Sequence, residues 1–93
     1  MVKPLGFEWN RYNKDKNWIK HKIDYKECEE VFFNKPLKIV NDPRHSLEEK
    51  RFVAYGITNQ SKKLTIVFTK RGEKIRVISA RNQSRKERSK YEE

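Results

Sequence analysis

The clearest pattern of apolar and polar positions lies in the second half of the chain. Residues 51–58, 64–69 and 75–79 are strand-like runs rich in β-branched and aromatic side chains. The connections between them, Asn59-Gln60-Ser61 and Arg71-Gly72, are typical of hairpins. These runs predict an antiparallel meander.

Two arginines lie in or at the end of the third run. Strict alternation puts Arg76, Ile78 and Ala80 on one face, and Val77, Ser79 and Arg81 on the other. Both arginines can then face one pocket from within the strand only if a bulge shifts the alternation between them. Arg81, at the strand end, could otherwise turn toward a pocket that Arg76 faces.

The first third of the chain predicts a short strand and a polar helix. The strand at 7–9 ends at Asn10, a favourable N-cap residue, and the helix should run to about Lys22. Its weak apolar stripe would consist of Tyr12, Ile19 and the stem of Lys16, with Trp18 to one side.

A second, more clearly amphipathic helix follows. Asp24 and Glu27 have the spacing of a capping box, and the helix should end near Asn34. Its buried face would carry Cys28, Val31 and Phe32. A weakly alternating strand is expected at 37–40.

The chain ends in a polar segment, 82–92, that favours a helix with Asn82 or Ser84 as N-cap. Glu87 and Tyr91 are four residues apart and share one face of this helix. Tyr91 would anchor the helix to the body. Glu87 could pair with a sheet arginine or act as a general base.

This order of elements predicts an α+β fold. Two N-terminal helices and a C-terminal helix would pack on an antiparallel sheet in one domain, residues 1–93. The chain is 34% hydrophobic and 39% charged, but its eleven Phe, Tyr and Trp residues favour a folded domain with one modest core.

Charge and residue content limit the possible partners. A net charge of +10 favours polyanions, nucleic acid before an anionic membrane. Cys28 is the only cysteine, which is typical of a reducing cytosol, and with only His21 and His45 beside it we expect neither a metal site nor a cofactor. No apolar run reaches eighteen residues, so we expect a soluble cytoplasmic protein.

The positive charge lies in two regions. Residues 70–90 include nine basic and two acidic residues, and residues 10–22 include five basic residues and one acidic residue. The segment 23–60 between them is nearly neutral. If the two regions meet in space, they form a concave basic surface for a phosphate backbone. Alternatively, these side chains solubilise exposed faces.

Three arginines are candidates for phosphate chemistry. A guanidinium held on a strand offers a planar set of donors to charge that develops on phosphorus. Arg76 and Arg81 fit this role, or they could form ion pairs with Glu87 or Glu49. Arg51 opens its strand on the face of an otherwise apolar run, where it suits a pocket rim or covers the core edge.

Lys20 and His21 lie at the expected end of the first helix, where the helix dipole attracts positive charge. His21 could transfer a proton, or it could simply cap the helix. His45 more simply belongs to a turn.

Several strings together resemble the BrnT family, toxins of bacterial toxin–antitoxin pairs. They are "FEW" before Asn10, "KH" at Lys20 and His21, "VF" at Val31 and Phe32, "HS" at His45 and Ser46, "EEKRF" with Glu49 and Arg51, Gly56, "IRVISAR" from Ile75 to Arg81, and Arg85, Glu87 and "YEE" from Tyr91. The match covers nearly the whole chain.

The resemblance implies a RelE/ParE-like fold and a metal-independent endoribonuclease in which the RNA 2′-hydroxyl attacks the adjacent phosphate. It also implies a BrnA-like antitoxin that contacts DNA through a ribbon-helix-helix domain. The candidate catalytic residues are His21, Arg51, Arg76 and Arg81. The candidate RNA-binding residues are Lys20, Lys74, Arg85 and Arg88, and Glu87 and Tyr91 would give structural support.

Two departures from the family affect the first helix. Asn13 stands where the family often has a lysine, and Lys14, one residue on, would face elsewhere. Lys22 replaces the usual glycine, so we expect the helix to lack its left-handed cap and to end differently.

Two other uses of the basic surface remain open. It could bind nucleic acid or protein without any cleavage. It could also serve in part to bind an acidic antitoxin surface.

Overall fold

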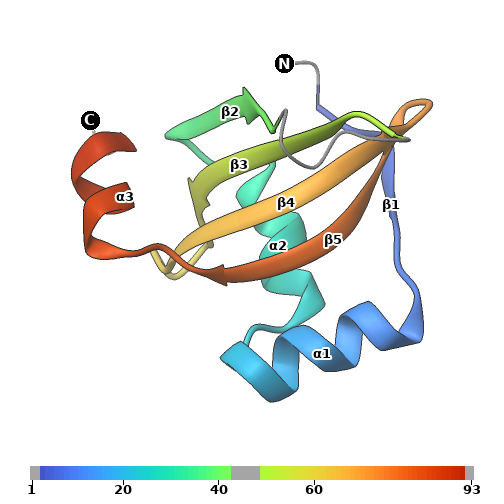
Figure 1. Ribbon diagram of the computed structural model, residues 1–93, viewed down its shortest axis with the longest axis horizontal. Coiled ribbons are helices and arrows are strands. Elements are labelled where there is room, and N and C mark those ends of the chain that lie inside the picture. Colours follow the sequence, from blue (N-terminus) through green and yellow to red (C-terminus); the bar gives the residue numbers. More distant parts are fainter. Residues whose placement is uncertain (1–2, 43–48, 92–93) are drawn as a thin grey trace.

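A five-stranded sheet dominates the computed structural model, which describes residues 3–42 and 49–91, with the side chains of Ile19 and Tyr91 left out. The elements, in chain order, are β1 (Gly6–Glu8), α1 (Arg11–His21), α2 (Tyr25–Val31), β2 (Leu37–Asn41), β3 (Arg51–Ile57), β4 (Lys63–Arg71), β5 (Lys74–Asn82) and α3 (Arg85–Tyr91). Figure 1 shows α1 and α2 on one side of the sheet, and α3 apart from them at the end where β5 finishes.

The sheet is mixed, with strand order β1-β5-β4-β3-β2. The predicted meander is confirmed, because β2, β3, β4 and β5 pair antiparallel. The wholly antiparallel sheet was wrong, because β1 pairs parallel with β5. A parallel pair needs a long connection, which the helices and three further strands supply here.

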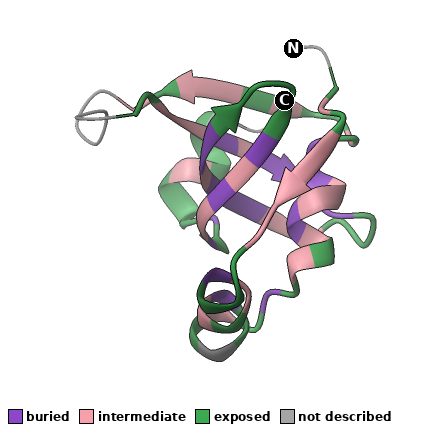
Figure 2. Cartoon of the chain, turned by 90° about the vertical axis from the view of Figure 1, so that its right-hand side faces the viewer, coloured by how far each residue is buried: buried purple, intermediate pink, exposed green. Residues whose placement is uncertain are grey.

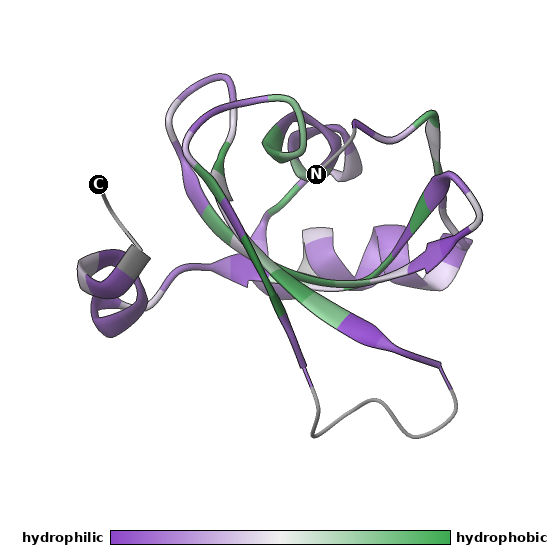
Figure 3. Cartoon of the chain, turned by 90° about the horizontal axis from the view of Figure 1, so that it is seen from above, coloured by the Kyte–Doolittle hydropathy of each residue, from purple (hydrophilic) through white to green (hydrophobic). Residues whose placement is uncertain are grey.

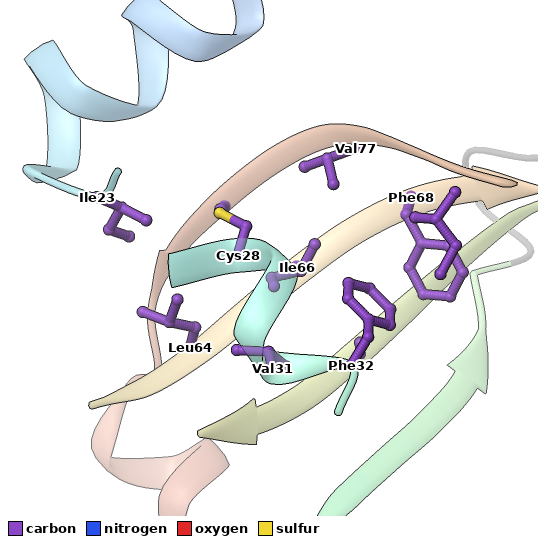
Figure 4. Packing of buried hydrophobic residues seen from close by; sticks show 11 residues of the cluster. Ile23, Cys28, Val31, Phe32, Leu64, Ile66, Phe68 and Val77 are labelled. Atoms are coloured by element: carbon purple, nitrogen blue, oxygen red, sulfur yellow. The ribbon is translucent and has the colours of Figure 1, made fainter. Parts of the chain in front are cut away.

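The core forms where α2 crosses the sheet, as Figure 4 shows. The predicted face of α2 is confirmed: Cys28, Val31 and Phe32 are buried and face Leu64, Ile66 and Phe68 of β4. The rings of Phe32 and Phe68 meet edge-on at 5.1 Å. The Asp24 capping box is present as well.

Helix α1 begins and ends with distinct caps. The Asn13 N–H donates to the Asn10 side chain at 2.7 Å, which confirms the N-cap. The expectation of a missing left-handed cap was wrong, because Lys22 itself adopts that conformation, with φ of 57°. The Lys22 N–H bonds to the carbonyls of Asn17 and Trp18, and these bonds offset the strain that a residue other than glycine carries there.

The inward face of α1 is polar. The predicted apolar stripe was wrong at Tyr12, which is 71% exposed, while Asn13 and Asn17 are buried. The side chain of Ile19, the other apolar member of that stripe, lies outside the described part. Trp18, predicted to lie to one side, is 53% exposed. The reason is the neighbour of α1: this helix lies against the backbone of β5, where polar side chains can satisfy hydrogen-bonding groups and apolar ones cannot.

The sheet consequently has two different faces. The covered face, toward α1 and α2, carries the buried apolar side chains of the strands. Figure 2 marks the buried residues of the strands in purple, whichever face they are on, and Figure 3 marks the apolar residues in green. The open face, on the other side, carries the alternate residues, most of them half-buried. Among the described helices, none is long and apolar enough to cross a membrane.

Candidate functional site

A β-bulge in β5 determines which side chains reach the open face. Phe68 of β4 pairs with Val77, but the preceding Val67 pairs with Ser79, so Ile78 is inserted without a partner. The alternation of β5 shifts at this residue.

This bulge corrects the strict alternation expected from the sequence. Val77 and Ala80 are both buried on the covered face, although they are three residues apart. Arg76 and Arg81 therefore lie on the same, open face, five residues apart, whereas unbroken alternation would separate them.

Two rows of paired residues cross the open face, each with an arginine in β5. Arg51, Thr69 and Arg76 form one row, and Tyr55, Thr65 and Arg81 form the other. At strand spacing, the Cα atoms of Arg51 and Arg76 are about 10 Å apart, and the two rows are about 13 Å apart. Tyr55 lies half-buried on the open face.

Between these rows lies a third, formed by Val53, Val67 and Ser79. Ser79 is about 6–7 Å from each arginine row along the sheet, a distance that an arginine side chain can span. The centre of the open face is therefore lined by small side chains and flanked by cations.

Arg81 is held by Glu87 of α3. The two Nη atoms of Arg81 donate to the two carboxylate oxygens of Glu87 at 2.7 and 2.8 Å, and the Thr65 hydroxyl donates to the same carboxylate at 3.2 Å. The hydrogen bonds from Arg81, helped by the Ser84 N–H and the Thr65 hydroxyl, overcome the effect of burial and lower the pKa of Glu87 to about 2. The prediction that Glu87 pairs with a sheet arginine is confirmed.

Arg76 differs from Arg81. Within residues 3–42 and 49–91, its guanidinium makes no hydrogen bond or ion pair. Glu49, the other carboxylate considered for it, pairs with Arg71 at 2.7 Å. The hydroxyl of Thr69, beside Arg76 in its row, is buried and has no hydrogen-bond partner among the described residues. Arg76 is thus available to an anion.

Helix α3 starts with a capping box whose N-cap is Ser84, one of the two residues expected there. The Glu87 N–H donates to the Ser84 hydroxyl, and the Ser84 N–H donates to the Glu87 carboxylate. Glu87 therefore links the helix start to the sheet arginine. Arg85 is exposed, and exposed Arg88 donates to the Gln83 carbonyl at 3.1 Å. The anchoring role of Tyr91 concerns a side chain outside the described part.

Lys20 and His21 lie at the end of α1. Contacts from α1 reach β5 in rising order along both elements, so the helix runs parallel to the strand. Because four helical residues and two strand residues cover similar lengths of about 6–7 Å, His21 lies near the level of Asn82, next to Arg81 along the chain. No hydrogen bond to another described residue involves the imidazole.

The remaining candidates lie away from this centre. Lys74 is exposed at the start of β5, opposite Arg71 and far from Arg81. His45 and Ser46 lie outside the described residues. Cys28 is buried, and this burial raises the pKa of its thiol to about 12, so it acts as an apolar core residue.

The described residues contain no group of three or more His, Cys, Asp or Glu side chains placed to hold a metal ion. What they do provide is a set of guanidinium and hydroxyl groups on one surface. Such groups bind and orient phosphate oxygens.

Sequence reasoning missed Thr65 and Thr69 as neighbours of the arginines. Alternation from Arg51 and the pairing of the meander would have identified the two threonines. Alternation already put Ser79 on the face of Arg81, but its position between both arginines required knowledge of the bulge, for which the sequence carries no signal.

Comparison with known proteins identifies the family of the chain and its fold. The profile of a family described as "Ribonuclease toxin, BrnT, of type II toxin-antitoxin system" matches residues 9–87. Among solved structures, the chain is similar to the Brucella abortus ribonuclease toxin BrnT, with a TM-score of 0.66 and 21% identity over 87% of this chain and 99% of that one. At this identity the structural match shows a shared fold. The search among curated proteins found no match.

Proposed function

The chain belongs to the BrnT family of ribonuclease toxins of type II toxin–antitoxin systems, and we propose that it cleaves RNA on the open face of its sheet without a metal ion. The observation that carries this proposal is the bulge at Ile78, which brings Arg76 and Arg81 to the same face as Arg51. Three guanidinium groups around small hydroxyl side chains match the negative charge that develops on a phosphate under attack.

The proposed site for the scissile phosphate is above Ser79, between the two arginine rows. Arg76, which is available to an anion, contacts the phosphate oxygens directly. Arg81, oriented by Glu87, supplies charge from the other side. Arg51, across Thr69 from Arg76, completes the cationic rim.

In the proposed reaction, the RNA 2′-oxygen bonds to the adjacent phosphorus and the bond from phosphorus to the 5′-oxygen breaks. The 2′-hydroxyl proton passes to a base, and the leaving 5′-oxygen gains a proton. The products are a 2′,3′-cyclic phosphate and a 5′-hydroxyl. His21 and Lys20 were the candidates for proton transfer and for charge stabilisation, but they end α1, which lies toward the covered face, so we do not place them at the site above Ser79.

RNA outside the cleavage site would be bound by exposed cations. Arg85 and Arg88 of α3 extend the surface beyond Arg81, and Lys74 extends it beyond Arg76. These contacts neutralise backbone phosphates, so binding should weaken as salt increases.

The test is cleavage by the purified protein in EDTA. We expect RNA to be cut, and the same RNA carrying 2′-O-methyl groups to stay intact because the attacking hydroxyl is missing. Arg76→Ala protein purified in the same way controls for a contaminating nuclease, and Lys26→Ala, an exposed cation on α2, controls for net charge. Cleavage of the 2′-O-methyl RNA would contradict the mechanism.

A binding module without catalysis is the alternative, and the ion pair that already occupies Arg81 favours it. Folded protein that binds RNA in a salt-dependent way, yet leaves it intact both with and without ribosomes, would support this alternative.

The family pairs its toxins with antitoxins. We propose that the partner of this chain is a BrnA-like antitoxin with a ribbon-helix-helix domain. The complex would act in the cytoplasm and would contact DNA only through that domain. An acidic segment of it would cover α3 and the open face, and would inhibit cleavage by occupying the arginines. Inhibition that RNA cannot compete away would argue against this placement.

A further inference from the structure

Three polar side chains of α1 contact the backbone of β5 at the bulge. The Asn13 side-chain amide donates to the Val77 carbonyl and the Lys16 ammonium donates to the Ile78 carbonyl, each at 3.2 Å. The Ala80 N–H donates to the Asn17 side-chain oxygen at 3.2 Å.

These contacts begin where the neighbouring strand ends. The last residue of β1, Glu8, pairs with Arg76, and β5 has no strand partner on this side from Val77 onward. A bulge also disrupts the hydrogen-bonding ladder on its own strand. Along the irregular part of β5, the side chains of α1 therefore form the hydrogen bonds that a neighbouring strand would otherwise form.

We propose that Asn13, Lys16 and Asn17 are positioning residues that hold the bulge, and with it the placement of Arg76 and Arg81 on one face. This inference rests on the proposed function for its consequence in catalysis. The structural part, that these three side chains maintain the bulge, can be tested without any cleavage assay.

A regular β5, without the bulge, would be less stable than the strand observed. Without the inserted Ile78, Arg81 would turn to the covered face, where Ala80 now lies buried. Burial of an arginine there is unfavourable. Loss of the α1 contacts should therefore leave residues 78–81 loosely held, with Arg81 sampling several positions.

The environment of Asn17 supports a positioning role. Its side chain is 1% exposed, and its amide nitrogen has no hydrogen-bond partner among the described residues. An unsatisfied buried donor is unfavourable for stability. The contribution of Asn17 is thus the hydrogen bond that its side-chain oxygen accepts from the Ala80 N–H, at the point where β5 resumes its regular pattern.

The first test measures the bulge itself by NMR. In the wild-type protein, cross-strand contacts should pair Phe68 with Val77 and Val67 with Ser79. In Asn17→Ala, we expect these contacts to weaken and the amides of residues 78–81 to exchange faster, while the contact between the rings of Phe32 and Phe68 persists. Asp15→Ala, on the exposed side of the same helix, should leave the bulge unchanged.

If Asn17→Ala does not fold, Asn13→Ala and Lys16→Met provide the same measurement, each removing a single bond. Bulge contacts that stay unchanged in all folded variants would overturn the inference. This outcome does not depend on whether the protein cleaves RNA, so failure of the inference and failure of the proposed function are distinguishable.

The second test measures catalysis. Displacing Arg81 should lower the single-turnover rate at saturating RNA about tenfold to a hundredfold, with a change in KM of less than about threefold, because small misplacements affect the reaction more than binding. A variant that loses the bulge but keeps the full rate would show that the arginine placement does not matter to cleavage.

Discussion

The covered and open faces of the sheet are formed by the same strands, yet their side chains have different roles. On the covered face, Phe68 is fully buried between the rings of Phe32 and Phe52. On the open face of the same hairpin, Arg76 is half-buried and has no polar partner among the described residues. A side chain that is packed on all sides contributes to stability, whereas a cation left without a partner is available for a ligand.

This difference predicts that substitutions on the covered face lower stability, and with it activity, while those on the open face lower activity alone. A residue that holds an open-face side chain in place, such as Glu87, should affect both.

The largest effect is expected for Phe68→Ala. Removing a fully buried ring leaves a cavity and should lower the free energy of unfolding by about 3–5 kcal/mol, a large part of the total for a domain of this size. Urea unfolding followed by circular dichroism measures this change. Phe68→Leu, which refills most of the space, should lose much less, and equal losses for both would show that this position is not well packed.

Arg76→Ala should affect cleavage almost as strongly, and stability hardly at all. Loss of a donor to the transition state should lower the cleavage rate at least about a hundredfold. Because Arg76 makes no polar contact among the described residues, the free energy of unfolding should change by less than about 0.5 kcal/mol. A large fall in melting temperature would assign Arg76 a structural role and would remove the contrast between the faces.

Glu87→Gln should lower stability by about 1–2 kcal/mol at neutral pH. This loss is smaller than the free energy that corresponds to the full pKa shift, because the Arg81 side chain is 47% exposed and solvent screens the ion pair. The pKa of Glu87 falls from 4.5 to about 2 on folding, so its contribution is present above about pH 4.5 and is lost as the pH falls toward 2.

The stability difference between wild type and Glu87→Gln should therefore shrink between pH 4.5 and pH 2. Glu73→Gln, which removes an exposed carboxylate in the β4–β5 turn, is the control and should show no such pH dependence. A constant difference across this range would mean that the ion pair does not stabilise the fold.

The smallest effect is expected for Lys22→Gly. Glycine adopts the left-handed conformation at this position without strain, so the free energy of unfolding should rise by about 0.5–1 kcal/mol, with cleavage unchanged. Lys22→Ala, which keeps the strain, should give no gain. A loss of stability in the glycine variant would show that the Lys22 side chain contributes more than its backbone costs.

Much of the fold could be predicted from the sequence, because local signals determine it. The hairpin connections gave the meander, Asn10 and Asp24 gave the helix starts, and the spacing of Cys28, Val31 and Phe32 gave the face of α2 that packs on the sheet. Each depends on residues within a few positions of one another.

The pairing of Glu87 with a sheet arginine was also foreseeable, because only a few carboxylates lie near the basic strand in sequence. Which arginine it would hold was not. The choice of Arg81 follows from the turn into α3, where the capping box points the Glu87 carboxylate back at the end of β5.

What the sequence determined by itself was the set of elements, the apolar core and the basic character of the C-terminal third. The tertiary structure decided where the arginines point. Arg76 and Arg81 share a face because Ile78 is inserted in β5, and the bulge lies where β1 has ended and α1 contacts the strand backbone. Those contacts join residues more than sixty positions apart, so no local pattern of apolar and polar residues could reveal them.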